Sequence, residues 1–393
     1  MKKVVFIQGR RTPFGSFGGT LKNFSATDLA LYASQQTLAA AAVKLESIDH
    51  IIFGQVVGAN ADSAYLPRHV GLKLGIPVDR PAYSVNRLCG SGFQSWIDAT
   101  MLIQLEYAQV VLAGGTESMS QIPFINSTVR FGQKMGHFEL QDLLTSALTD
   151  RYPNLAMAMT AENLGEHYKL RRDLVDEYSL LSQRRYQSAF TAGVFSNEIA
   201  PINIQSTIET HTLRRDEHAK FDTSLNQLAQ LKSIFKIDGL VTAGTASGIA
   251  DGAAASILAN EHWAIKNQIR PLARIIHWTV VGCPPDIMGI GPVYAIKKLL
   301  QETSLTLANI DLFEVNEAFA AQYLAVEKEL QLDRLKTNIH GGAIAMGHPL
   351  GASGTRIMNH LAAQLDRLQL RYAIGSACIG GGQGVAILIE RYK

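Results

Sequence analysis

The chain has 393 residues, enough for two ordinary domains or for one large domain with an insertion. Its 36 Lys and Arg side chains stand against 34 Asp and Glu, a formal net charge of +2, and 47 % of the residues are hydrophobic. This composition excludes a disordered or collagen-like chain, and it lacks the basic excess that nucleic-acid binding requires. We expect a folded protein without a nucleic-acid partner.

No apolar run approaches the roughly 18 to 20 residues that cross a bilayer, so no membrane span is predicted. Only four apolar residues precede Gln8, too few for the core of an export signal. The three cysteines, Cys89, Cys283 and Cys378, suit a reducing compartment, and the absence of a CxxC pair argues against a structural zinc site.

Strands and helices alternate through the first 117 residues. Ser25 and Asp28 have the spacing of a capping box ahead of an Ala- and Leu-rich helix that runs to about residue 44. The other predicted elements are strands at 3–8, 49–57, 82–86 and 109–113 and helices at 66–74 and 93–107. This order favours a mostly parallel sheet covered on both faces.

From residue 118 to about 245 the alternation loosens into two helical runs, 157–167 and 172–192, joined by polar connections. We interpret this stretch as an inserted loop domain over the active site.

The second half of the chain repeats the first. Strands at 253–258, 272–281 and 312–315 and a helix at 293–302 restore the alternation. The segments 82–86 and 336–339 both lead into Gly-rich turns and then long helices, 90–107 and 351–368. We infer a duplicated α/β unit, with boundaries at 1–117, 118–250, 251–270 and 271–393.

Cys89 lies between Asn86 and Gly92 at a predicted helix start. A helix dipole there lowers the pKa of a thiol and favours its thiolate, the form that acts as a nucleophile. The alternative is a small buried core residue.

Cys378 precedes Gly380, Gly381 and Gly382. Consecutive glycines expose backbone N–H groups that can stabilise an oxyanion, although a plain turn explains them as well. Among the 11 histidines, His348 is the strongest candidate for a base because it lies between Gly347 and Pro349 in a Gly-rich turn; His340 is the nearest competitor.

Asn316 follows a strand and begins a helix, where it caps the helix or holds a water or an acyl oxygen. A thiolate with a histidine base performs acyl transfer, and a second thiol can move a proton. This chemistry requires no metal.

Four segments, 84–92, 316–319, 347–354 and 378–384, resemble the active-site motifs of the thiolase family in their order. The resemblance runs from residue 3 to residue 390. It implies an α/β fold of two duplicated halves in a five-layered α-β-α-β-α core, with an inserted loop domain that binds coenzyme A.

By this resemblance Cys89 accepts the acyl group, His348 activates it, and Cys378 is the acid and base. Asn316 would hold a water that forms one oxyanion hole with His348, and the N–H groups of Cys89 and Gly380 would form the other. Coenzyme A is then a substrate, and no cofactor is expected.

The implied coenzyme A contacts share a place in or beside the inserted segment: Met157, Lys220, Ala243, Ser247, Ala318 and Phe319. The sequence departs from the family pattern at Lys220, commonly Arg, and at Thr245, usually Asn. A lysine cannot stack on adenine as a planar guanidinium does.

Within the family the chain resembles the degradative 3-ketoacyl-CoA branch of mitochondrial type. Ala156 stands where acetoacetyl-specific members carry His, which favours a wider acyl pocket. The implied reaction is cleavage of 3-ketoacyl-CoA by coenzyme A in β-oxidation. The alternatives are condensation of two acetyl-CoA, carrier-protein-dependent condensation, and a non-catalytic acyl-CoA-binding protein.

Residues 127–142 resemble the projecting loop that joins two dimers in the family, so a homotetramer is expected. The missing C-terminal SKL-type signal argues against peroxisomes. We expect a bacterial cytoplasmic protein, with the mitochondrial matrix as the alternative.

Overall fold

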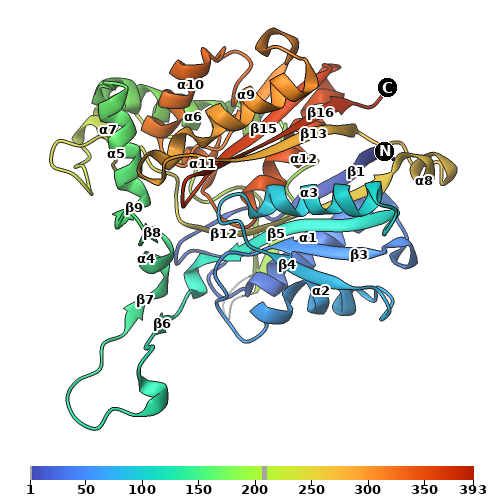
Figure 1. The fold of residues 1–393 in the computed structure, drawn as a ribbon, viewed down its shortest axis with the longest axis horizontal. Coiled ribbons are helices and arrows are strands. Elements are labelled where there is room, and N and C mark those ends of the chain that lie inside the picture. Colours follow the sequence, from blue (N-terminus) through green and yellow to red (C-terminus); the bar gives the residue numbers. More distant parts are fainter. Residues whose placement is uncertain (1, 206–209) are drawn as a thin grey trace.

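The structure is a computed structural model that describes residues 2–205 and 210–393. Its main sheet runs in the order β14-β15-β16-β13-β1-β12-β5-β3-β4, and β2 pairs with β12 (Figure 1). The strands of the first half are β1 (Val4–Arg11), β2 (Gly15–Ser16), β3 (His50–Gly54), β4 (Ala82–Val85), β5 (Val110–Ser118) and β12 (Ala250–Asn260). Those of the second half are β13 (Ala273–Gly282), β14 (Leu312–Val315), β15 (Tyr372–Ile379) and β16 (Gln383–Arg391). Strand β1 pairs with both β12 and β13 and so joins the two halves.

The expectation of a mostly parallel sheet is wrong. Only β3 with β4, β3 with β5 and β14 with β15 are parallel among the pairings of the main sheet, within the described residues. Strand β12 returns from the inserted segment and lies antiparallel between β1 and β5. Strand β16 follows β15 through a glycine turn, and this close connection forces an antiparallel pair.

The helices and the main sheet form five layers. Helices α1 (Ala26–Ala41) and α2 (Leu66–Leu74) cover the outer face of the first half, while α9 (Gly291–Thr303) and α10 (Ala320–Leu330) cover that of the second. Helices α3 (Ser91–Gln104) and α12 (Ser353–Leu368) lie between the two halves and share one apolar core with strands of both (Figure 1). On β5, Val111 faces this central core and its neighbour Leu112 faces the α1 layer, as the alternation along a strand requires. The expected five-layered α-β-α-β-α arrangement is confirmed.

The inserted segment carries shorter elements. They are α4 (Leu143–Ala147), α5 (Met157–His167), α6 (Arg172–Thr191) and α7 (Leu225–Gln230), with the strand pairs β6 (Phe124–Ile125) and β7 (Gln141–Asp142), β8 (Thr149–Asp150) and β9 (Leu155–Ala156), and β10 (Ile202–Gln205) and β11 (Thr210–Leu213). The remaining helices are α8 (Glu261–Lys266) and α11 (Ala343–Met346). The loop between β6 and β7 projects from the body as a long arm (Figure 1). The four expected domain boundaries remain a prediction.

Several predicted elements have different ends. Strand β5 continues through Gly114 and Gly115 to Ser118, and β15 continues through Cys378 to Ile379. At Gly115 a Cβ atom would overlap the carbonyl oxygen of Gly351, so glycine there permits close packing and does not end the strand. The segment 336–339, which we interpret from the sequence as the counterpart of the strand at 82–86, forms only isolated bridges, of Thr337 with Phe313 and of Ile339 with Gly341.

Candidate active site

The starts of α3 and α12 meet in the central layer. The Thr355 hydroxyl donates to the Gly92 carbonyl at 3.2 Å, and a Cβ on Gly92 would lie 2.6 Å from the Thr355 nitrogen. Glycines at 92 and 354 therefore let the two backbones approach. Cys89 and His348 precede these two starts, which brings their turns into one region.

Cys89 is half-buried just before the N-cap of α3. Leu88 before it has a φ of 48°, a left-handed conformation that is rare for a leucine. Burial raises the pKa of the Cys89 thiol to about 11, although the Gly380 N–H, which hydrogen-bonds the sulfur, lowers it. The expectation that the helix dipole gives a low pKa is therefore wrong, because burial outweighs it. The resting thiol is protonated and requires a base.

His348 is oriented to serve as that base. Its Nδ1 lies 2.6 Å from the Ser353 hydroxyl, which itself donates to the Pro349 carbonyl at 3.1 Å. Since the hydroxyl proton is already used, Nδ1 carries the imidazole proton and Nε2 keeps its lone pair. Burial, followed by the charge of Arg356, lowers the pKa of His348 to about 4, so the ring is neutral at physiological pH.

Asn316 faces His348 across the same space. Its Nδ2 is 3.3 Å from His348 Nε2, and its backbone N–H donates to the Ser376 carbonyl at 2.9 Å. Its Oδ1 is buried and has no hydrogen-bond partner among the described residues. A buried orphan acceptor marks a place for a donor from outside the chain, such as a water or a substrate group.

Cys378 is fully buried on β15. It packs against Met288 and Ala318, with Met157 and Phe319 at the edge of the cluster. Burial raises the pKa of its thiol well above the usual value, and the nearby Cys89 raises it further. Both thiols are thus held protonated in one enclosed region.

The candidate coenzyme A contacts fall into two adjoining groups. Met157, Ala318 and Phe319 lie beside Cys378, and the Ser247 N–H donates to the Ala318 carbonyl at 2.9 Å. Lys220 and Ala243 instead line a cavity of about 280 Å³ together with His218, Gln183, Leu228 and Leu231. The cavity adjoins the turn of His348, because His218 contacts Gly248 and the Gly248 carbonyl accepts from the His348 N–H at 2.8 Å.

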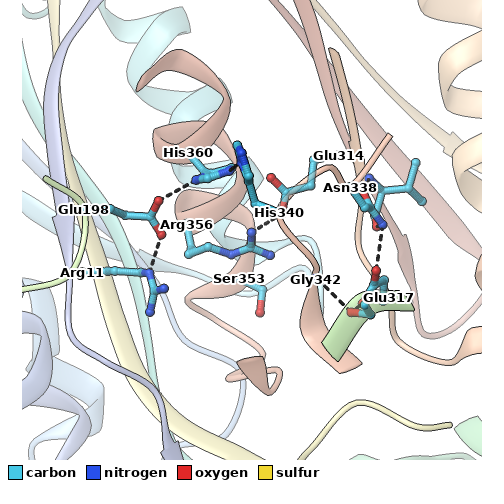
Figure 2. Close-up of polar contacts among 12 residues, drawn as sticks. Arg11, Glu198, Glu314, Glu317, Asn338, His340, Gly342, Ser353, Arg356 and His360 are labelled. Carbon is cyan, nitrogen blue, oxygen red and sulfur yellow. Dashed lines mark hydrogen bonds and ion pairs between the residues drawn. The ribbon is translucent and has the colours of Figure 1, made fainter. Parts of the chain in front are cut away.

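The buried polar groups that surround the site were not identified from the sequence. Glu317 accepts from the Tyr178 and Ser182 hydroxyls at 2.6 and 2.7 Å and from Asn338 Nδ2 at 3.1 Å, which ties α6 to the strand-to-helix turn of Asn316 (Figure 2). Arg356 pairs with Glu314 (Figure 2), and its charge acts on His348. A carboxylate directly after Asn316 was the one signal that could have indicated this role.

His340, the competitor of His348, belongs to another network. Its Nδ1 is 3.0 Å from His360 Nε2, and His360 Nδ1 is 2.6 Å from Glu198, which also pairs with Arg11 (Figure 2). Within the described residues, none of the hydrogen bonds of His340 and His360 reaches Cys89 or Cys378. Within 2–205 and 210–393, no group of three or more His, Cys, Asp and Glu side chains is placed to hold a metal ion. No helix in this described part is long and apolar enough to cross a membrane.

Two family models match the chain, the N-terminal domain of thiolase over residues 4–262 and its C-terminal domain over residues 269–391. The chain belongs to the thiolase family. This thiolase is 52 % identical over 391 residues to the mitochondrial 3-ketoacyl-CoA thiolase of Homo sapiens, covering 99 % of this chain and 98 % of that protein.

Solved structures of thiolases also match this chain, in both sequence and fold. The crystal structure of human mitochondrial 3-ketoacyl-CoA thiolase in complex with CoA matches with a TM-score of 0.97 at 52 % identity, covering 99 % of this chain and 98 % of that one. The acetyl-CoA acetyltransferase of Bacillus anthracis matches with a TM-score of 0.97 at 41 % identity, covering 100 % and 99 %. The predicted family and fold are confirmed.

Proposed function

We propose that this thiolase cleaves 3-ketoacyl-CoA with coenzyme A to acetyl-CoA and a shortened acyl-CoA. The observation that carries the proposal is the enclosure of two protonated thiols, Cys89 and Cys378, in one site with a neutral His348 whose Nε2 carries a lone pair that can take a proton. The 52 % identity to the human mitochondrial 3-ketoacyl-CoA thiolase over nearly the whole chain supports the degradative reaction.

In the first half-reaction His348 Nε2 takes the Cys89 proton, and the sulfur attacks the 3-keto carbon. The bond between carbons 2 and 3 breaks, and carbon 2 keeps the electron pair and takes the proton of Cys378. Acetyl-CoA leaves, and the shortened acyl group stays on Cys89. Donors held by Asn316 and His348, and the N–H groups of Cys89 and Gly380, stabilise the two oxyanions, each donor contributing about 3 to 4 kcal/mol.

In the second half-reaction the Cys378 thiolate takes the proton of an incoming coenzyme A thiol. The coenzyme A sulfur attacks the acyl carbonyl, and Cys89 leaves and recovers its proton from His348. Every group returns to its starting protonation state. Coenzyme A is therefore a substrate, and the proposal includes no resident cofactor.

We propose that the thiol end of coenzyme A lies beside Met157, Ser247, Ala318 and Phe319. Met157, Ala318 and Phe319 pack with Cys378, and Ser247 is hydrogen-bonded to Ala318. The rest of the molecule then occupies the cavity of Lys220 and Ala243. Lys220 is exposed at this cavity and supplies a positive charge for phosphate.

The direct test is the loss of 3-ketoacyl-CoA Mg²⁺-enolate absorbance when free coenzyme A is added. Wild type and Cys89→Ser are compared on acetoacetyl-CoA and on a medium- to long-chain series, after dialysis against a chelator and with Mg²⁺ restored for the readout. We expect cleavage of the longer chains by wild type and none by the variant. Activity confined to acetoacetyl-CoA would instead assign acetoacetyl-CoA thiolysis and condensation.

We propose a homotetramer joined through the projecting arm. The arm exposes 91 % of Phe131, 89 % of Met135 and 58 % of Phe138, a concentration of apolar surface that monomeric proteins avoid. Sedimentation should give four times the subunit mass for wild type and half of that for Met135→Asp. A wild-type mass of one subunit would refute the tetramer.

We place the protein in a bacterial cytoplasm, with the mitochondrial matrix as the alternative. Two functional free thiols favour a reducing compartment. The mitochondrial name of the human relative supports the alternative. Immunodetection in fractionated source cells separates the two.

A further inference from the structure

Glu117 is a buried carboxylate that the proposed mechanism does not use. It lies on β5 and is fully buried. Its Oε2 accepts from the N–H groups of Gly351 at 2.9 Å and Val56 at 3.1 Å, and its Oε1 accepts from Val57 N–H at 3.0 Å. None of its hydrogen bonds within the described residues comes from Lys, Arg or His.

One oxygen of Glu117 is attached to the turn of the base. Gly351 lies three residues after His348, in the turn that the Ala352 N–H closes on the Pro349 carbonyl at 3.0 Å, just before α12. Leu350 of this turn packs in an apolar cluster that Cys89 also contacts. The bond to Gly351 therefore fixes the backbone that carries His348.

The other oxygen, Oε1, is linked to the turn of the nucleophile through the peptide group between Val56 and Val57, whose N–H it accepts at 3.0 Å. The carbonyl of Val56 accepts from Asn86 Nδ2 at 2.9 Å, and Asn86 Oδ1 accepts from the N–H of Leu88 at 3.0 Å. Leu88 directly precedes Cys89. One hydrogen-bonded path thus connects His348's turn, Glu117 and the backbone before Cys89.

The hydrogen bonds at this position require a carboxylate and cannot all be made by an amide. A carboxylate offers acceptors on both oxygens, whereas an amide offers one acceptor and one NH₂ group that would face an N–H donor. Burying the charge is costly. Burial raises the pKa of Glu117 to about 7, and the three backbone N–H groups offset only part of this shift.

We infer that Glu117 is a positioning residue whose two oxygens hold the turns of Cys89 and His348 at their working separation. The inference rests on the proposed function for its turnover readout. Because a displacement of about 1 Å in an active site costs about 10²-fold in rate, the effect should be large.

The test compares wild type, Glu117→Gln and Asp251→Asn. Asp251 is a matched control, because it is also a fully buried carboxylate of the same sheet, but its side chain accepts from Ser120. We expect kcat to fall about 10²-fold in Glu117→Gln, with KM for coenzyme A changed less than about threefold, and Asp251→Asn to stay within about threefold of wild type. Equal losses in both variants would make Glu117 a purely structural residue.

A second readout needs no substrate. The rate of Cys89 alkylation by iodoacetamide is measured at pH 8, where Glu117 is ionised. If Glu117 acted only through its charge, its removal would lower the pKa of Cys89 and speed alkylation. Loss of the correct separation from His348 should slow it, so an unchanged or faster rate would overturn the inference.

The pH profile gives a third readout. Among the described residues, Asp251 and Cys89 are the titratable groups coupled to Glu117, and burial holds the pKa of Cys89 at about 11. The pKa of His348 is held at about 4 by burial and Arg356. The kcat of wild type should fall below about pH 7, and this fall should be absent in Glu117→Gln.

The experiments distinguish a failure of the proposed thiolytic function from a failure of the proposed role of Glu117. A wild type that cleaves no 3-ketoacyl-CoA refutes the proposed function, while the alkylation rates still decide the role of Glu117. If Glu117→Gln does not fold, the variant Asn86→Asp is tested in its place. Asn86 is exposed, and an aspartate there still accepts from the Leu88 N–H but can no longer donate to the Val56 carbonyl. This variant should slow both alkylation and turnover, and wild-type rates would overturn the inference.

Discussion

Replacement of Asp216 by alanine should detach the inserted segment from the first strand. Arg11 on β1 is fully buried, and its Nη1 and Nη2 donate to the two oxygens of Asp216 at 2.6 and 2.9 Å. Asp216 also accepts from the N–H of Phe14 at 2.7 Å, while Arg11 Nε pairs with Glu198 at 2.6 Å. The ion pairs therefore connect the sheet to two parts of the inserted segment.

The magnitude follows from these contacts. Three bonds to a charged group, each contributing about 1.5 to 3 kcal/mol, bound the loss from above. Glu198 still compensates part of the Arg11 charge, so we expect the cost of breaking one buried pair, about 3 to 5 kcal/mol. This free energy corresponds to an opening equilibrium between about 10²- and 10⁴-fold larger.

Amide hydrogen exchange measures that opening directly. The N–H of Ala200 donates to the Arg11 carbonyl at 2.8 Å, and that of Glu217 donates to the Phe14 carbonyl at 2.9 Å, so both report on the junction. Their exchange should accelerate in Asp216→Ala by the factor above, while amides in the centre of β5 keep their rates. As a control, Asp173→Ala removes an exposed ion pair and should leave these rates unchanged. An acceleration below tenfold in Asp216→Ala would refute the reasoning.

Three other outcomes are expected. Cys378→Ala should still form the acyl-enzyme from an acyl-CoA thioester but lose cleavage of 3-ketoacyl-CoA, which mass spectrometry and the enolate assay detect separately. Gly115→Ala should lower the unfolding free energy by about 1 to 3 kcal/mol in urea titrations, because its Cβ would overlap the Gly351 carbonyl; a wild-type midpoint would contradict this. Burial and Arg356 hold the pKa of His348 at about 4 against 6.5 in the unfolded chain, so the folded state binds fewer protons and loses stability as pH falls through this window. An NMR titration of the His348 ring with a midpoint above 6 would exclude this contribution of His348 to the pH dependence of stability.

Local signals in the sequence located many elements well. The capping box of Ser25 and Asp28 is present at the start of α1, and the predicted helices at 66–74 and 157–167 have the bounds of α2 and α5. These elements depend on contacts between neighbours in the chain, which a pattern of capping and apolar residues records. The direction of β12 depends on a strand pairing across the whole inserted segment, and no local pattern contains it.

Some residues of the candidate site could likewise be predicted from local sequence, and others could not. Cys89, Cys378, His348 and Asn316 were found because Gly-rich turns and helix starts are visible in the sequence. Ser353 and Glu117 were missed, because each acts through hydrogen bonds set by the meeting of two distant turns. The pKa of Cys89 was predicted in the wrong direction for a related reason, since the degree of burial at a helix start is a property of the assembled layers.

The contact between the starts of α3 and α12 has a consequence for how such an enzyme diversifies. The chemical groups are mounted on a junction of two packed halves, while Lys220, Ala243 and Ser247 belong to the inserted segment. The inserted segment also supports the chemical groups, because Tyr178 and Ser182 bind Glu317 next to Asn316 and the Gly248 carbonyl accepts from the His348 N–H. An exchange of the insert would therefore change the positions of Asn316 and His348 together with the cavity of Lys220, so the insert and the two halves have to vary together.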